Sequence, residues 1–274
     1  MVAASTQKQY DQRIKILNDA GFTDFLKNPE KVLAFVNSKS EKFSTRKVYI
    51  SAILSTITDK TKTPLVYRDA LKEFFNLQNE KAESNELTEG QKENEMSWND
   101  ILDVQKILAD EENKTISTWR MYVVVSLYTL NDPTRANYGD MKVSSLRPSG
   151  TGNELVWGGP KPYFVFREYK TAKTYGDTIV RVNPALKKVI EGWFDFLGKT
   201  PEYILDVEYS NIVLSNYIRD VFKRITMKAV GINLLRHARI TYELAKPKTI
   251  KVKKALARNM MHSQSTQGTY QVIQ

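Results

Sequence analysis

A polar, acidic segment divides the chain into two stretches with different sequence patterns. Residues 78–97 carry almost no apolar side chain, contain one glycine, and include six glutamates (Glu80, Glu83, Glu86, Glu89, Glu93 and Glu95). A segment of this composition cannot bury enough apolar surface to fold by itself. With 274 residues the chain fits two domains. We therefore expect a helical domain at 1–79, an acidic, flexible linker at 80–97, and a second domain at 98–274.

Before the linker, apolar residues recur at spacings of three and four, which is typical of amphipathic helices. The third predicted helix has one apolar face (Val48, Ile50, Ile53, Leu54 and Ile57). Two prolines, Pro29 and Pro64, stand where a helix is expected to begin. The pattern predicts helices at 6–20, 28–38, 44–59 and 65–77.

After the linker, helical and strand-like patterns both occur. Three short strand-like stretches, 141–146, 163–169 and 178–182, are separated by glycine-rich and proline-rich turns. Helices are predicted on both sides of them, at 99–109, 114–130, 184–197, 210–229, 233–245, 250–261 and briefly around Tyr270. The predicted fold class is mainly α with a small antiparallel β-sheet, an α+β arrangement.

Composition restricts the chemistry that the chain can perform. There is no cysteine, which excludes disulfides, thiolate nucleophiles and zinc fingers. No apolar run approaches the roughly eighteen residues that a membrane span requires. The first residues lack a charged start followed by an apolar stretch, so we expect an intracellular protein that is not secreted.

The net charge of +10 is concentrated near the carboxyl terminus. Between Arg236 and Arg258 there are eight Lys or Arg residues and one acid, Glu243. This run indicates a surface for a polyanion such as DNA. A solvated helix face is the commoner explanation of such a run when it stands alone.

The same region contains both histidines of the chain, His237 and His262, and Tyr270 follows the second by eight residues. The planar guanidinium of Arg236 can hold two oxygens of one phosphate, whereas we expect His237 to be structural. A tyrosine phenol has a pKa of about 10 and needs cationic neighbours before it can attack phosphorus. The position of Tyr270 after the histidine singles it out among fourteen tyrosines.

Two further cations are candidates for the same site. Arg135 follows Pro133 and is expected to start a helical stretch in which Asp140 steadies it. Lys170 is expected at a hairpin tip, where it could protonate a departing 5′ oxygen as a general acid, and Lys173 competes for this role. Taken alone, each of these residues is more often a solvated surface charge.

Other enzyme signatures are absent from the sequence. It contains neither GxxxxGK[ST] nor HExxH, and two histidines without cysteine make no ordinary zinc site. An acidic set suggests a magnesium nuclease, although its helical spacing favours a solvated helix face (Asp100, Asp103, Asp110, Glu111 and Glu112). We expect no cofactor and no metal.

Taken in order, Arg135, Lys170, the Leu235-Arg236-His237 box, the Met261-His262-Ser263 box and Tyr270 resemble the tyrosine recombinases of the phage-integrase family. The stretches 133–143 and 169–176 are especially similar to integrase-like recombinases of large DNA viruses and virophages. The resemblance covers 98–274 with motifs, and 1–97 only through a helical character like that of the family's core-binding domain.

This resemblance implies a site-specific recombinase or integrase that acts on double-stranded DNA as a homotetramer, without metal or nucleotide cofactor. Arg135 and Arg236 would clamp the scissile phosphate, Lys170 would protonate the leaving oxygen, His262 would donate to the phosphate, and Tyr270 would form a 3′-phosphotyrosine.

The chain departs from the family pattern at three points. Asn233 stands where the family usually has histidine and cannot act as a general base. Met261 replaces a common glycine, and only four residues follow Tyr270. These departures leave open the proton acceptor for the tyrosine and the mode of tetramer assembly.

Two other functions remain open at this point. A type IB topoisomerase shares the phosphotyrosine chemistry but relaxes DNA as a monomer. A basic DNA-binding protein with an inactive site is the other alternative, and Asn233 is its best support.

Overall fold

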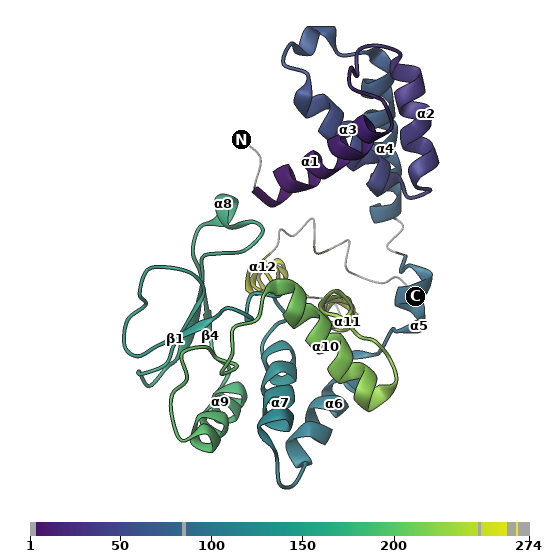
Figure 1. The fold of residues 1–274 in the computed structure, drawn as a ribbon. Helices are drawn as coiled ribbons and strands as arrows, with labels where there is room; N and C mark the ends of the chain where they lie inside the picture. Colours follow the sequence, from purple (N-terminus) through teal and green to yellow (C-terminus); the bar gives the residue numbers. More distant parts are fainter. Residues whose placement is uncertain (1–3, 84–85, 246–247, 262–266, 268–274) are drawn as a thin grey trace. The chain divides into compact units, whose positions relative to one another are not determined.

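The chain forms two compact units, Met1–Ser84 and Asn85–Gln274 (Figure 1). The computed structural model describes residues 4–83, 86–245, 248–261 and 267. The boundary between the units falls within the predicted linker. In the described part of the chain, no helix is both long and apolar enough to cross a membrane.

The amino-terminal unit consists of helices, as the apolar spacing predicts. The helices are α1 (Ala4–Asp19), α2 (Pro29–Lys39), α3 (Phe43–Thr56) and α4 (Leu65–Glu83), with a 3-10 turn at Lys60–Lys62. Pro29 is the first residue of α2, where the missing N–H of proline costs no hydrogen bond.

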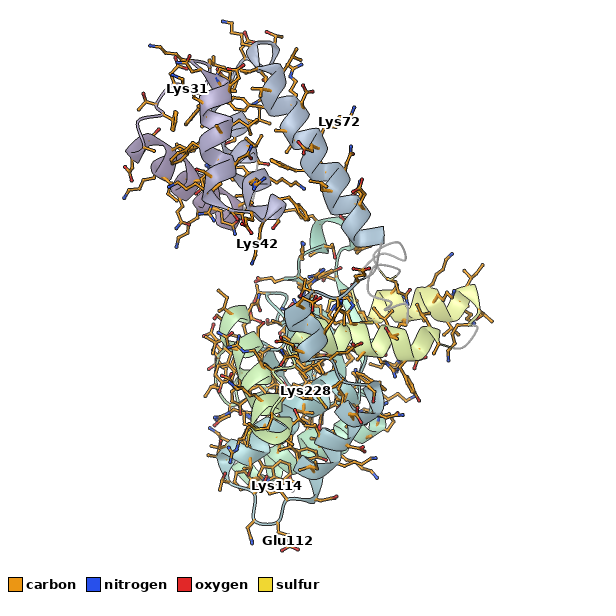
Figure 2. All side chains as sticks on the ribbon, turned by 90° about the vertical axis from the view of Figure 1, so that its right-hand side faces the viewer. Lys31, Lys42, Lys72, Glu112, Lys114 and Lys228 are labelled. Atoms are coloured by element: carbon orange, nitrogen blue, oxygen red, sulfur yellow. The ribbon has the colours of Figure 1, made fainter. Side chains whose placement is uncertain are left out.

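The core of this unit packs α3 against α1, α2 and α4. Ile50 and Ile53 are fully buried in it, and the buried Tyr67 donates from its hydroxyl to the carbonyl oxygen of Phe25 at 2.8 Å. Lysines such as Lys31 and Lys72 point outward into solvent (Figure 2). The unit therefore buries one apolar interior and presents charged side chains outside.

In the carboxy-terminal unit, helices precede and follow the strands of a sheet along the sequence, and one four-residue helix lies between two of the strands. They are α5 (Glu89–Glu93), α6 (Trp98–Asp110), α7 (Ile116–Thr129), α8 (Ala172–Tyr175), α9 (Pro184–Leu197), α10 (Asn211–Thr226), α11 (Ile232–Leu244) and α12 (Ile250–Asn259). Helix α7 is central, because α6, α9 and α10 all pack against it. Its apolar run Val123–Val125 is buried, as expected for a helix covered on several sides.

The sheet has four strands in the order β1 (Lys142–Ser144), β2 (Glu154–Val156), β3 (Tyr163–Phe166) and β4 (Thr178–Arg181). Strands β2, β3 and β4 pair antiparallel, whereas β1 pairs parallel to β2. The α+β fold class is confirmed, but the sheet is mixed and not wholly antiparallel. Strand β2 escaped prediction because it is short and begins with a charged residue.

The segment predicted as a flexible linker is largely part of the carboxy-terminal unit. Leu87 and Met96 pack against its core. Lys228 donates from Nζ to the carbonyl oxygen of Glu95 at 2.7 Å, and the backbone N–H of Ala229 donates to Oδ1 of Asn94 at 2.6 Å. Two apolar residues and these polar contacts are enough to fix residues 86–97 in place.

Candidate active site

Arg135 lies in the irregular segment between α7 and β1, so the predicted helix start at this residue is wrong. Tertiary contacts fix the backbone here instead. The carbonyl oxygen of Arg135 accepts hydrogen bonds from the hydroxyl of Tyr128 at 2.9 Å and from the N–H of Asn137 at 2.7 Å. The ring of Tyr138 packs edge-on against Tyr128, with 5.3 Å between ring centroids.

The side chain of Arg135 is half-buried, and it lines a cleft. Its Nε is buried, and no hydrogen-bond acceptor among the described residues contacts it. The described ion pairs do not join it to Asp140, so the predicted steadying carboxylate is not a partner there. A buried donor without an acceptor is uncommon in folded proteins, although Nε of Arg13 in the amino-terminal unit has the same property.

Two asparagines connect the Arg135 segment to the end of β3. Asn137 donates from Nδ2 to the carbonyl oxygen of Glu168 at 3.0 Å, and Asn153 donates to the same oxygen at 3.1 Å. Oδ1 of Asn153 accepts from the N–H groups of Arg167 and Glu168, both at 3.0 Å. These contacts fix the backbone two residues before Lys170.

Lys170 follows the end of β3 and has an exposed side chain, as expected for a residue at a hairpin tip. The turn after it forms the one-turn helix α8, which contains Lys173. Lys170 lines the same cleft as Arg135, whereas Lys173 is not among the described residues that line it. The two lysines are therefore placed differently with respect to Arg135.

This cleft has a volume of about 810 Å³ and joins residues from four parts of the sequence. We call it the Arg135 cleft. It brings together three predicted site residues, Arg135, Lys170 and Asn233. Asn233 is exposed in the first turn of α11, where its amide can donate and accept hydrogen bonds.

Helix α10 contributes residues to the Arg135 cleft that were not predicted from the sequence. Asn211, Ser215 and Arg219 line it, and their spacing of four residues places them on one face of the helix. This polar stripe is the signal in the sequence that could have revealed them. Arg219, which is exposed, adds a third cation to the cleft.

Arg236 lies one helical turn after Asn233 but is fully buried, with a relative exposure of 0%. Its Nη1 donates to the carbonyl oxygens of Pro133 and Met260, both at 3.0 Å. Arg236 is not among the described residues that line the Arg135 cleft. It therefore joins the segment before Arg135 to the end of α12.

His262 and Tyr270 lie outside the described residues. The chain is described up to Met261, whose carbonyl oxygen accepts a hydrogen bond from Oγ1 of Thr171 at 3.3 Å. Thr171 directly follows Lys170, so the described chain before His262 ends beside the Lys170 turn.

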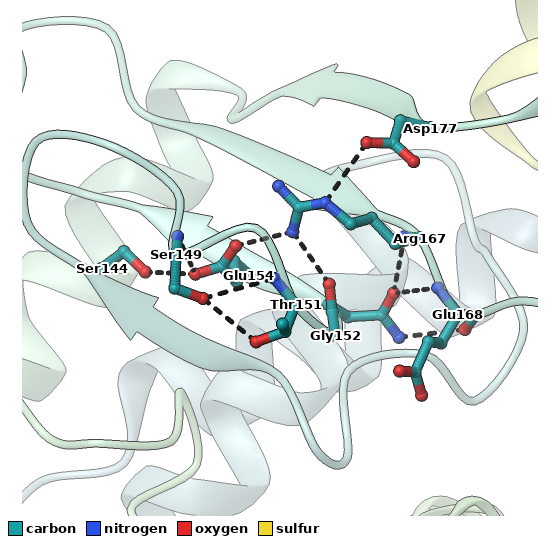
Figure 3. Close-up of polar contacts among 9 residues, drawn as sticks. Ser144, Ser149, Thr151, Gly152, Glu154, Arg167, Glu168 and Asp177 are labelled. Carbon is teal, nitrogen blue, oxygen red and sulfur yellow. Dashed lines mark hydrogen bonds and ion pairs between the residues drawn. The ribbon is translucent and has the colours of Figure 1, made fainter.

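A buried ion pair supports the strands on the sheet side of the site (Figure 3). Nη1 of Arg167 contacts Oε2 of Glu154 at 2.6 Å, and Oε1 of Glu154 accepts from Ser144 Oγ at 2.6 Å and from Ser149 N at 2.8 Å. Burial alone would raise the pKa of Glu154, but the hydrogen bonds from Ser144, Ser149 and Arg167 outweigh it and lower the pKa to about 2. Glu154 is therefore ionised and holds β1, β2 and the end of β3 together.

The acidic set near α6 has structural partners. Asp100 forms a capping box with Ser97 at the start of α6, and Asp103 forms an ion pair with Lys106 at 2.8 Å. Within the described residues, no group of three or more His, Asp or Glu could hold a metal ion.

No family model and no curated protein sequence matches the chain. Among solved structures, one titled "Crystal structure of XerA recombinase" aligns with 16% sequence identity and a TM-score of 0.48, covering 100% of this chain and 89% of that chain. At this identity and score, the likeness assigns neither an activity nor a site residue to the chain.

Proposed function

We propose that the protein is a site-specific DNA recombinase or integrase that cleaves and rejoins DNA through a 3′-phosphotyrosine. One observation supports this most: the Arg135 cleft gathers Arg135, Lys170 and Asn233 from three distant segments, with Arg236 one helical turn from Asn233. Two arginines and a lysine around one phosphate suit phosphoryl transfer, in which fixed donors stabilise the charge that develops on phosphorus.

In the proposed cleavage step, the phenolic oxygen of Tyr270 attacks the scissile phosphorus and loses its proton to solvent. Arg135 and Arg236 bind the non-bridging oxygens, and His262 donates a further hydrogen bond. The bond between phosphorus and the 5′ oxygen breaks, and Lys170 donates the proton that makes a free 5′ hydroxyl. Asn233 acts as a hydrogen-bond donor, since an amide cannot take up the phenolic proton.

In the proposed rejoining step, a 5′ hydroxyl of another strand gives its proton to Lys170 and attacks the phosphotyrosine. The new phosphodiester forms as the tyrosyl oxygen leaves and regains a proton, so the phosphodiester bond energy is conserved. Exchange between duplexes requires two of them, and we therefore propose a homotetramer on double-stranded DNA. The net charge of +10 favours binding through phosphates.

The proposal is tested with nicked duplexes from which the cleaved fragment diffuses away, so that a covalent protein–DNA adduct accumulates. We expect a denaturant-resistant adduct with the wild-type protein and none with Tyr270→Phe. Tyr242→Phe is the control, because Tyr242 is 49% exposed and its ring can lose the hydroxyl without loss of packing. An adduct that persists in Tyr270→Phe contradicts the proposal.

A second assay separates recombination from DNA relaxation. Two duplexes with different labels are mixed with the protein, and strands that carry both labels are expected. Relaxation of supercoiled DNA without such strands would indicate a topoisomerase, and duplex binding without any adduct would indicate an inactive DNA-binding protein.

A further inference from the structure

A carboxylate outside the Arg135 cleft joins three segments of the carboxy-terminal unit. Asp132, in the segment before Arg135, accepts from Arg239 of α11 and from Asn259 of α12. Oδ1 of Asp132 lies 3.0 Å from both Nε and Nη2 of Arg239, and Oδ2 lies 2.9 Å from Nδ2 of Asn259. Both oxygens of this side chain therefore have a partner on a different helix.

In each of the three segments, the residue that makes these contacts is within three positions of a residue that takes part in the hydrogen bonds of Arg236. Pro133, which accepts from Arg236, directly follows Asp132, and Met260, the other acceptor, directly follows Asn259. Arg236 and Arg239 are one turn apart on α11. We call these six residues the Asp132 junction (Asp132, Pro133, Arg236, Arg239, Asn259 and Met260).

The two halves of the junction differ in burial. Arg236 is fully buried, whereas the side chains of Asp132 and Arg239 are 15% and 23% exposed. Asp132, Arg239 and Asn259 border a second cleft of about 950 Å³. The side chains of Asp132 and Arg239 are thus close to solvent, and substitution of either leaves the main apolar core of the unit closed.

Helix α12 depends on these polar contacts because its apolar contacts are few. Leu256 and Met260 form a small cluster with Ile240 that is separate from the main core of the unit. Most other side chains of α12 are exposed. The Asp132 carboxylate adds to the contacts that fix the carboxyl-terminal end of α12, together with the buried Met260 and with Met261, which belongs to the main core.

We propose that Asp132 is a positioning residue for phosphoryl transfer, an inference that rests on the proposed function. After Met260, the chain turns at Met261 with φ of 54°, and the carbonyl oxygen of Met261 accepts from Thr171 beside Lys170. The end of α12 is thus the start of the segment that carries His262 and Tyr270. By holding Asn259, Asp132 sets where this segment begins relative to Arg236 and Lys170.

The experiment measures the single-turnover rate of adduct formation at saturating protein, together with duplex affinity and thermal unfolding. Asp132→Asn removes one of the two carboxylate charges that contact Arg239, the other being Glu243 at 3.0 Å, and leaves one acceptor oxygen for the donors of Arg239 and Asn259. We expect adduct formation to slow by about 10²-fold, as for a small displacement of reacting groups. Duplex affinity should stay unchanged, because Asp132 is an acid and offers nothing to a phosphate.

Asp206→Asn is the matched control. Asp206 is 19% exposed and forms an ion pair with Lys199 at 3.1 Å, and its φ of 58° is one that asparagine tolerates. We expect Asp206→Asn to cleave at the wild-type rate. If both variants slow cleavage in proportion to their loss of thermal stability, Asp132 is merely structural and the inference is overturned.

A swapped pair separates positioning from stability more sharply. In Asp132→Asn with Asn259→Asp, an amide and a carboxylate again face each other, with donor and acceptor exchanged between the two segments. We expect this double variant to recover part of the rate that Asp132→Asn loses, whereas Asn259→Asp alone should be as slow as Asp132→Asn. No recovery in the double variant contradicts the positioning role.

The outcome for the wild-type protein distinguishes the two proposals. A wild-type adduct together with an unimpaired Asp132→Asn variant overturns only the positioning role. Failure of the wild-type protein to form any adduct overturns the proposed function, and the role of Asp132 falls with it.

Discussion

The Arg135 cleft and the Asp132 junction place an arginine in opposite surroundings, although they share one segment of chain. In the cleft, Arg135 is held through its own carbonyl oxygen, and its half-buried side chain lines the cleft wall. In the junction, Arg236 is held through its guanidinium, which donates to two backbone carbonyls. Arg135 thus lines a cleft, whereas Arg236 connects two backbone segments.

This difference predicts which variants of the carboxy-terminal unit lose only cleavage and which also lose stability. Removing a side chain that contacts only a ligand should lower cleavage and leave folding intact. Removing a side chain that also satisfies buried carbonyls should lower both, because a buried acceptor without a donor costs free energy. The variants below test this comparison in order of their expected effect on cleavage.

Arg236→Ala should have the largest effect. It removes one proposed phosphate ligand and leaves the carbonyl oxygens of Pro133 and Met260 without their donor, so cleavage should fall by at least about 10³-fold. The free energy of unfolding should fall by about 3 kcal/mol, measured by urea denaturation. Arg236→Ala with wild-type stability would show that the junction does not depend on this guanidinium.

Arg135→Ala should lower cleavage by about 10²- to 10³-fold, the usual loss when one fixed donor to a transition state is removed. Its unfolding free energy should stay within about 0.5 kcal/mol of wild type, since the segment is held through backbone groups. Adduct formation and urea denaturation measure the two effects. Equal losses of stability in Arg135→Ala and Arg236→Ala would remove the contrast between cleft and junction.

Lys170→Ala should slow cleavage by about 10²-fold if Lys170 is the general acid. A substrate with sulfur in place of the 5′ bridging oxygen should restore the rate, because a thiolate leaves without protonation. Lys173→Ala is the matched control and should cleave both substrates normally. Rescue by sulfur in Lys173→Ala, and not in Lys170→Ala, would exchange the roles of the two lysines.

Glu154→Gln should have the smallest effect on cleavage and a clear effect on stability. The pKa of Glu154 is lowered from 4.5 to about 2, so its contribution to stability is complete above pH 4.5 and is lost as pH falls towards 2. The contribution is about 3 kcal/mol, given the size of that shift. Urea denaturation between pH 2 and 5 should show this loss in the wild type and a flatter profile in Glu154→Gln; equal profiles would contradict the assignment.

The sequence predicted those parts of the fold that depend on local pattern. The helix at 184–197 was predicted with the bounds that the structure has, because Asn183 caps it, Pro184 begins it and Gly198 ends it. The helix predicted from Arg135 is wrong because its backbone is fixed by Tyr128, which the local pattern does not reveal. Strand β2 was missed because it is short and begins with Glu154, whose burial depends on partners outside the strand, Ser144, Ser149 and Arg167.

The candidate site was predictable as a set of residue types but not as an arrangement. The motif order singled out Arg135 and Lys170, and Asn233 stood out as a departure from the family pattern; the structure brings these three to one cleft. Contacts between distant residues were out of reach of the sequence, since nothing local couples Asp132 to Asn259, 127 positions later. The complete burial of Arg236 could not be predicted either, because the carbonyl groups that accept its hydrogen bonds belong to two other segments.

We propose that the Arg135 cleft and the Asp132 junction serve one phosphate. A structure of the covalent protein–DNA adduct tests it most directly. We expect the phosphate to be bound to Tyr270, with the guanidinium groups of Arg135 and Arg236 both about 3 Å from its non-bridging oxygens. A phosphate attached elsewhere, or one that does not contact both arginines, would contradict the claim.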